Sequence, residues 1–471
     1  MPQNLTLTEN PATPPVIQTH RRRNILLLAA LLVGALLLRL FALGSFPSNL
    51  MADEADNLVV IYEVLYGNRP GGIFGLDWKP NPILSLYATA PFVALFRDSA
   101  LGLRLLSALT SVAALIPLYA LYRRHLGGPA ALLSLALLST SVWYLNFSRS
   151  GWENVHVVLL TAVAFWLLAK ALETGRWRYW AFAGVVASLG LYAYFAGRAI
   201  LVALLVYAPV ALWQHRKSLR RVAAGYALLG VVAVSLFLPQ LPAIGRNPYQ
   251  FNVRAERVSV LKAAETGYFG RQGTLDVLRY QLARNARFFF DGDVLAGDAY
   301  SPPEQLLKDT RPRYSPFGEP LLDPFTAVLF AAGLVLSLWR SGRYAMWWAM
   351  LLVPWLLTQV LTINTPDAAR GIGMLPAIYF FVALALDRAW TLLPQATKVL
   401  RPALIIAVAT AAAVTTLTYF SWAGSPEALS AREPAVPLER FEEWSELQVA
   451  RARANQPLLP VTIWQQMQGG E

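Results

Sequence analysis

The chain has 471 residues, of which 56% are hydrophobic and 14% are charged, and its mean hydropathy is +0.43. Because a soluble protein is about 25% charged, this chain has too little polar surface to be a soluble enzyme, a disordered protein or a disulfide scaffold. It contains no cysteine, and its net charge of +12 is typical of basic cytoplasmic loops in a membrane protein.

The N-terminal residues 1–23 are polar and contain prolines, which predicts a disordered cytoplasmic tail. The triplet Arg21–Arg23 precedes an apolar run, Asn24–Gly44, of about 20 residues, which is long enough to cross a bilayer. A signal peptide would have a shorter apolar core, so we expect a retained first span. The three arginines place the N-terminus in the cytoplasm by the positive-inside rule.

Ten further apolar segments each predict a membrane span, which makes eleven in all. The predicted fold class is therefore an all-α polytopic membrane protein. The ten segments are Leu101–Tyr122, Pro129–Phe147, Asn154–Ala171, Tyr179–Phe195, Ala199–Trp213, Val222–Leu241, Leu322–Trp339, Tyr344–Ile363, Gly371–Trp390 and Pro402–Trp422.

One more apolar segment, Pro82–Phe96, has only about 15 residues and is short for a span. Loop charges decide its place, because a span here would move basic pairs such as Arg123 and Arg124 from the cytoplasm to the outside. We therefore predict an interfacial helix on the outer surface of the membrane.

This topology predicts one transmembrane domain, residues 24–422, with juxtamembrane helices in two large outer loops at 45–100 and 242–320. Residues 423–471 form a short tail on the outer side. The tail contains one amphipathic helix, which Pro437 can start and in which Phe441, Trp444 and Leu447 are spaced by three. This helix either caps the protein's own loops or docks a partner protein.

Ionisable residues are scarce inside the predicted spans and gather at their outer ends. A transporter would place polar groups nearer the middle of the membrane. The pattern instead predicts a site at the outer interface, open to both lipid and water. The residues at this depth are Arg39, Asp53, Glu54, Asp56, Lys79, Arg149, Glu153, Arg198 and Arg370.

Each local motif has an ordinary structural reading beside a functional one. Asp53 and Asp56 share a face of a predicted helix, which is also a common arrangement for a charged first turn. Lys79 stands before two prolines that fix the chain, where a lysine can simply reach the membrane surface. Arg149 and Glu153 flank a very short outer turn, and a local ion pair explains them equally well.

Taken in chain order, the motifs resemble the membrane-embedded GT-C glycosyltransferases of the protein O-mannosyltransferase and lipid A aminoarabinose transferase superfamily. The resemblance covers about residues 24 to 422, and the second loop is similar to that of bacterial members around Asn247–Arg254 and Phe290–Asp293. The chain departs from the family at Asn81, where proline is common, and at Glu153, where aspartate is common. The matching elements are the acidic pair Asp53–Glu54, the element Lys79–Pro82, the turn Arg149–Glu153 and the segment Arg370–Pro376.

The resemblance implies an inverting glycosyltransferase of the bacterial plasma membrane that uses a polyprenyl-phosphate-linked sugar on the outer face. A departing phosphate needs fixed positive charge, and the acceptor hydroxyl needs a carboxylate to take its proton. By match to the family, Asp53 is the candidate base and Glu54 is the next candidate. Lys79, Arg198 and Arg370 are implied as phosphate ligands, and Arg149, Glu153, Arg39 and Tyr194 as residues of the cavity.

No cofactor is required by the sequence, because its four histidines form no zinc-like pair. Some GT-C enzymes use a divalent cation, for which Asp53 and Glu153 are the candidate ligands. The main alternative is a non-catalytic GT-C-like subunit or scaffold that binds partner proteins, and a lipid transporter is the less favoured one. Protein hydroxyl, lipid head and cell-wall polysaccharide all fit as acceptors.

Overall fold

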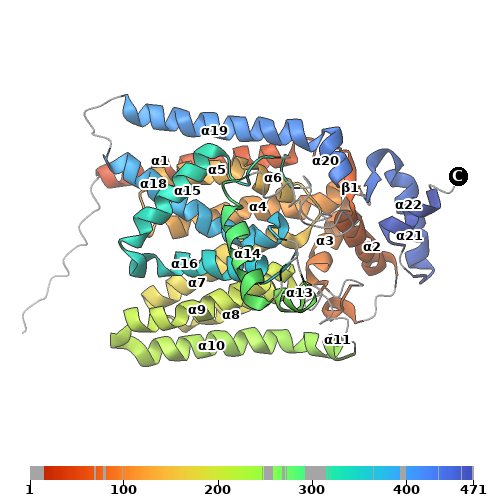
Figure 1. Ribbon diagram of the computed structural model, residues 1–471, viewed down its shortest axis with the longest axis horizontal. Helices are drawn as coiled ribbons and strands as arrows, with labels where there is room; N and C mark the ends of the chain where they lie inside the picture. The colour runs from red at the N-terminus through yellow and green to blue at the C-terminus, as the bar shows by residue number, and fades with distance from the viewer. Residues whose placement is uncertain are drawn as a thin grey trace, which may run out of the picture.

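The computed structural model is almost entirely helical, and its long helices run side by side between two ends (Figure 1). Short helices gather at one end, which we name the loop end: α2 (Ala52–Tyr66), α3 (Leu84–Leu95) and α13 (Val260–Thr266). The structure describes residues 15–67, 71–77, 81–97, 99–246, 248, 258–267, 271, 273–291, 314–316, 318–363, 365–392, 399–432, 434–457 and 459–468.

The protein is a multi-pass membrane protein, as predicted. Within the described residues, seven helices are long and apolar enough to cross a membrane, and a bent pair makes an eighth. The first is the part of α1 (Pro15–Leu40) from Arg22 on, and the other six contain α4 (Ala100–Tyr122), α7 (His156–Thr174), α9 (Arg198–Gln214), α10 (Leu219–Phe237), α18 (Leu375–Leu392) and α19 (Leu400–Ala423).

Three other predicted spans are helices too, but each is short: α8 (Trp177–Tyr192), α15 (Pro324–Leu338) and α16 (Ser341–Trp355) have 16, 15 and 15 residues. All eleven predicted segments are thus helical, while the count of eleven crossings stays a prediction. The helix α3 has only 12 residues, which is too few to span a bilayer.

The bent pair is α5 (Gly128–Thr140) and α6 (Val142–Ser148), which meet at 61°. Ser141 causes the break, because its extended backbone ends α5 and its hydroxyl accepts a hydrogen bond from the Tyr144 amide at 3.2 Å. A serine that caps a new helix in this way separates two helical segments that hydropathy alone merges.

The centre of the bundle is α18, which is almost completely buried. Phe380 of α18 stacks on Trp347 of α16 with ring centroids 3.8 Å apart. By contrast, α1 and α19 lie along one edge and α10 along the other, with most of their apolar surface exposed (Figure 1). Exposed apolar surface on outer helices is what a lipid environment favours.

The N-terminal tail differs from the prediction. Helix α1 begins at Pro15, so residues 15–23 are helical, whereas residues 1–14 lie outside the described residues. A helix that the apolar span has nucleated extends easily into the preceding residues, because each added residue gains a hydrogen bond without a new nucleation step.

The C-terminal tail covers the loop end of the bundle. It contains α20 (Pro426–Ala431), β2 (Ala435–Pro437), α21 (Phe441–Arg453) and α22 (Val461–Gln468), which is more than the one predicted helix. Strand β2 pairs antiparallel with β1 (Asn49–Met51), the three residues before α2.

Helix α21 packs on α2 through Trp444 of the predicted apolar face, whereas Leu447 of that face is exposed. Trp444 is fully buried against the ring of Tyr62, and the Tyr62 hydroxyl lies 2.6 Å from the Ser445 hydroxyl. Of the two roles that the sequence left open, capping the protein's own loops or docking a partner protein, the structure shows the first. The tail therefore fixes both β1 and α2, the elements that lead to and carry Asp53.

Candidate active site

The acidic pair of α2 divides into one buried and one accessible carboxylate. Glu54 is 0% exposed and its Oε1 lies 3.1 Å from Nε of Arg104, while the Gly151 amide donates to the same oxygen at 2.7 Å. Asp53, its neighbour on the first turn, is only partly buried. The oxygens of Glu54 are thus bound inside the protein, whereas Asp53 keeps part of its surface exposed.

Arg104 was not predicted from the sequence as a residue of the site. It lies in the predicted span Leu101–Tyr122, and its other nitrogens donate to the backbone carbonyls of Leu43, Pro47 and Asn49. Burying an arginine in a membrane-spanning helix costs free energy unless the charge is paired, so its presence in this span was a signal for a buried acidic partner. With Glu54 it ties the segment before α2 to α4.

We expect the Glu54–Arg104 pair to stabilise the fold rather than the reaction. Replacing Glu54 by Gln leaves the Arg104 charge buried without its partner, and losing one partner of a buried pair costs about 3–5 kcal/mol. The melting temperature of the purified variant in detergent should fall well below that of the wild type. A variant with an unchanged melting temperature and no activity would instead assign Glu54 to the chemistry.

Glu153 lies within electrostatic reach of two other carboxylates, those of Asp77 and Asp53. Glu153, in η2 (Glu153–Val155), is 7% exposed, and Asn57 Nδ2 donates to its Oε2 at 2.7 Å. The charges of Asp77 and Asp53 both act on Glu153. We name Asp53, Asp77 and Glu153 the acidic cluster.

Asp77 is also hydrogen-bonded to Asn81, two residues beyond the predicted phosphate ligand Lys79 in the sequence. The Asn81 amide donates to Asp77 Oδ1 at 2.6 Å and its side-chain Nδ2 donates to Oδ2 at 2.8 Å. Lys79 itself lies outside the described residues. Among the residues that are described, no three of the Asp, Glu and His side chains are grouped to hold a metal ion, and the pair of Asp53 with Glu153 stays a prediction.

Arg149 and Arg39 are placed inside the protein. Arg149 Nη1 donates to the carbonyls of Leu38 and Arg39 at 3.0 and 2.7 Å, which satisfies the last turn of α1. Arg39 Nε donates to Ser111 Oγ at 2.7 Å and its guanidinium lies over the Tyr144 ring. Both side chains are fully buried, so they hold helices together, where the sequence had suggested that they line the cavity.

Two of the three predicted phosphate ligands share one pocket of about 290 Å³. Arg198 is the first residue of α9, and Arg370 belongs to the short helix α17 (Ala368–Gly371). Tyr194, which the sequence also assigned to the cavity, lines the same pocket together with Thr358 and Thr362. We name it the dibasic pocket. Asp53 is not among its lining residues.

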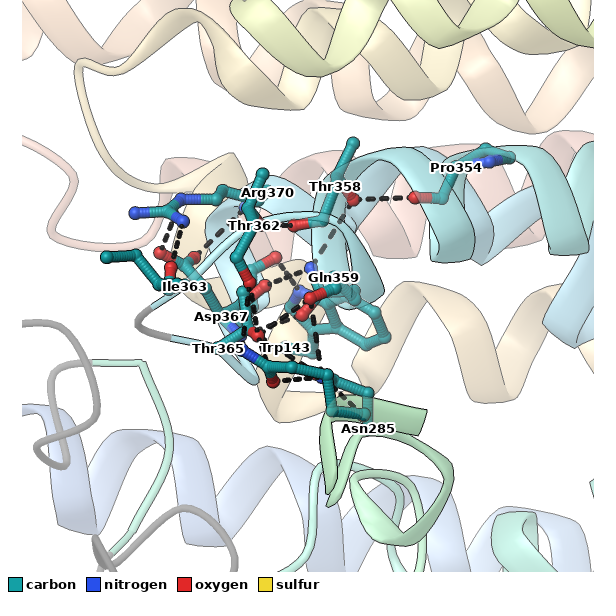
Figure 2. A network of polar contacts seen from close by, with 12 residues as sticks. Trp143, Asn285, Pro354, Thr358, Gln359, Thr362, Ile363, Thr365, Asp367 and Arg370 are labelled. Carbon is teal, nitrogen blue, oxygen red and sulfur yellow. Dashed lines mark hydrogen bonds and ion pairs between the residues drawn. The ribbon is translucent and has the colours of Figure 1, made fainter. Parts of the chain in front are cut away.

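The orientation of Arg370 is fixed by Asp367 and by the turn before it. Arg370 Nε lies 3.3 Å from Asp367 Oδ2, and Nη1 donates to the carbonyl of Ile363 at 2.9 Å (Figure 2). Asp367 is fixed in turn by Gln359, whose Oε1 accepts the Asp367 amide and whose Nε2 donates to the Asp367 carbonyl, both at 2.9 Å. The guanidinium therefore needs little reorganisation to meet an anion.

Gln359 itself belongs to η6 (Leu356–Val360), a π-helical turn that follows α16. Its backbone carbonyl accepts a hydrogen bond from Thr365 Oγ1 at 2.7 Å, and Asn285 Nδ2 donates to Thr365 Oγ1 at 3.2 Å (Figure 2). Single π turns inside helices are frequent at functional sites. Neither Gln359 nor Asn285 was predicted, because neither belongs to a recognisable motif.

One aromatic contact joins the acidic cluster to the dibasic pocket. The ring of Trp152, which precedes Glu153, packs edge-on against Tyr194 with centroids 5.6 Å apart. Helix α9 starts at Arg198, four residues after Tyr194. The turn that carries Glu153 therefore lies next to the turn that leads into α9, at the rim of the dibasic pocket.

Part of the sequence is similar to known proteins. Residues 80–242 match the family described as dolichyl-phosphate-mannose-protein mannosyltransferase. The chain is 28% identical over 172 residues to undecaprenyl phosphate-alpha-4-amino-4-deoxy-L-arabinose arabinosyl transferase 1 of Pseudomonas fluorescens. This match covers 34% of the chain and only 30% of that relative.

Two solved structures share the architecture over most of the chain. The Archaeoglobus fulgidus oligosaccharyltransferase has a TM-score of 0.53 at 16% identity, over 89% of this chain and 56% of its own. ArnT from Cupriavidus metallidurans in the apo state has a TM-score of 0.51 at 12% identity, over 92% and 78% of the two chains. The chain thus has the fold of the GT-C membrane glycosyltransferases, and within it residues 80–242 match the protein mannosyltransferase family.

Proposed function

We propose that this protein is an inverting glycosyltransferase that moves a sugar from a polyprenyl-phosphate donor to an acceptor at the outer face of the bacterial plasma membrane. The observation that carries the proposal is the dibasic pocket, which Arg198 and Arg370 line together and which the turn before Glu153 contacts through Trp152 and Tyr194. The names of the matched family and relative both contain a polyprenyl phosphate, either dolichyl or undecaprenyl.

The pocket suits the departing phosphate. Negative charge grows on the phosphate as the bond to the sugar breaks, and two guanidinium groups held in place stabilise that charge. Lys79 is a third proposed ligand. Asp53 is the proposed base, because it is accessible whereas Glu54 is bound to Arg104. A carboxylate near the acceptor hydroxyl takes its proton as the new glycosidic bond forms.

An apolar groove is the proposed binding site for the lipid chain of the donor. Helices α9 and α16 pack together, and a groove of about 920 Å³ opens between them, lined by Val206, Trp213, Trp348 and Leu352 among others. Helix α9 and the turn η6 that follows α16 both reach the dibasic pocket, at Arg198 and Thr358. A polyprenyl chain in this groove would bring its phosphate to the two arginines.

The non-catalytic alternative is tested by the same assay as the enzyme. Purified protein in detergent would be incubated with undecaprenyl-phosphate-linked sugars and a cell-envelope extract as the source of acceptor, and release of undecaprenyl phosphate would be measured. Turnover of one sugar supports the enzyme. Binding of undecaprenyl phosphate without any turnover supports the subunit, and absence of both rejects the proposal.

The outer location of the site predicts a labelling pattern. Because the chain has no cysteine, single-cysteine variants can be labelled without background. Glu427→Cys in α20, on the side of the C-terminal tail, should react with a membrane-impermeant maleimide in intact cells. Lys217→Cys, between α9 and α10, should react only after the membrane is permeabilised, since basic loops stay inside. The reverse pattern would place the site in the cytoplasm.

A further inference from the structure

A second basic pocket lies at the end of the bundle away from the proposed donor site. Helix α16 starts at Ser341 and ends next to η6, which carries Thr358 of the dibasic pocket. Helix α9 starts at Arg198 and ends at Gln214, whose Nε2 donates to the Gly342 carbonyl at 2.6 Å. The first turn of α16 and the residues just before it therefore lie at the end of the bundle opposite the loop end (Figure 1).

The pocket has a volume of about 430 Å³ and is formed by the ends of α15, α16 and α18 with the turn between α4 and α5. Its charged and imidazole side chains come from the turn after α4, from the start of α16 and the residue before it, and from α18. They are His125, Arg340, Arg343, Asp387 and Arg388.

The pocket has an excess of positive charge. Within the described part of the chain, none of Arg340, Arg343 and Arg388 forms an ion pair, whereas Asp387 Oδ1 accepts a hydrogen bond from the Gly127 amide at 2.8 Å. Burial lowers the pKa of His125 to about 4, helped by the charges of Arg343 and Arg124, so this imidazole is neutral at pH 7. Arg340, Arg343 and Arg388 are exposed residues that line one pocket, and an anion bound there would offset their like charges.

The walls of the pocket indicate that the anion belongs to an amphiphile. Leu336 and Leu384 line it beside the arginines, and Trp339 at its rim is 77% exposed. An exposed tryptophan at a helix end is typical of the membrane–water interface, where lipid headgroups lie. Basic pockets between transmembrane helices bind the phosphates of anionic lipids.

We propose that this pocket binds the headgroup phosphate of an anionic phospholipid, with the acyl chains lying against the exposed apolar face of α15 at Val335 and Leu338. The site is separate from the donor site, since the two pockets lie at opposite ends of α16. Both can therefore be occupied at once. The bound lipid ties α15, α16 and α18 together at the end where their connecting turns carry like charges.

The test compares two triple variants in the full-length protein. Arg340→Ala/Arg343→Ala/Arg388→Ala removes the pocket charges, and Arg216→Ala/Lys217→Ala/Arg220→Ala removes three exposed charges from the same end without touching the pocket. Lipid retention is measured by native mass spectrometry after delipidation and titration with cardiolipin, phosphatidylglycerol or phosphatidylcholine. Melting temperatures are measured with the same lipids and with inorganic phosphate.

We expect wild type and the control variant to retain cardiolipin or phosphatidylglycerol in preference to phosphatidylcholine, and both to melt at a higher temperature with the anionic lipid. The pocket variant should bind these lipids at least about tenfold more weakly, because charge-assisted contacts are lost. Replacing the same arginines by lysine should recover part of the affinity, which separates lost binding from misfolding. If both triple variants lose lipid affinity equally, the binding reflects general surface charge and not the pocket. If inorganic phosphate raises the melting temperature as much as the anionic lipid does, the pocket is a site for free anions. Either result overturns the proposal.

Discussion

Asp53→Asn should lower the rate of sugar transfer by about 10²–10⁴-fold, the usual scale for loss of a general base, while donor binding survives. Asn has nearly the same shape as Asp but cannot take the proton of the acceptor hydroxyl. Asp53 stands on the first turn of α2, where it is accessible, and β1 and α21 fix that helix from both sides. The loss should therefore appear in kcat more than in KM.

A matched control separates this effect from a general change of charge. Glu427→Gln removes one exposed carboxylate from the C-terminal tail, which covers the same end of the bundle, and should keep the wild-type rate. Asp53→Asn should also keep a melting temperature close to that of the wild type, in contrast to Glu54→Gln. Wild-type turnover in purified Asp53→Asn would exclude Asp53 as the base.

The helices could be predicted from the sequence because the bilayer fixes their length and composition. Each predicted span is helical, yet the break at Ser141 escaped prediction, since apolar residues continue on both sides of it. The pairing of β1 with β2 escaped as well. Three-residue strands carry no periodic signal, and their partners lie at opposite ends of the chain.

The site could be predicted only in part. The position of Arg198 and Arg370 at helix ends was enough to place them at one depth, and they do share a pocket. Depth alone does not tell which way a side chain points, and for this reason Arg149 and Arg39 were assigned to the cavity although they bind backbone carbonyls inside the bundle. Glu54 and Arg104 are 50 residues apart in the sequence, so no local sequence pattern predicts that they pair.

Arg370→Ala should weaken binding of undecaprenyl phosphate by about 10–100-fold, because a hydrogen bond to a charged group contributes roughly 1.5–3 kcal/mol. Transfer should fall further, since phosphate charge grows in the transition state. Arg370→Lys should recover only part of the loss. A lysine carries the charge but lacks the planar fork with which Arg370 contacts Asp367 and the Ile363 carbonyl while it faces the pocket. Arg279→Ala, an exposed arginine of α14 (Thr274–Arg287), is the control and should bind the lipid normally.

The strictest form of this prediction is a double-mutant cycle between Arg198 and Arg370. If both guanidinium groups contact one phosphate, the effect of Arg370→Ala on binding should depend on whether Arg198 is present, with a coupling of about 0.5–3 kcal/mol. If each arginine only reaches independently toward lipid headgroups, the two single losses should add. Strict additivity, with donor binding otherwise intact, would end the assignment of a shared phosphate site, and the arginines would then be membrane anchors at the outer ends of α9 and α17.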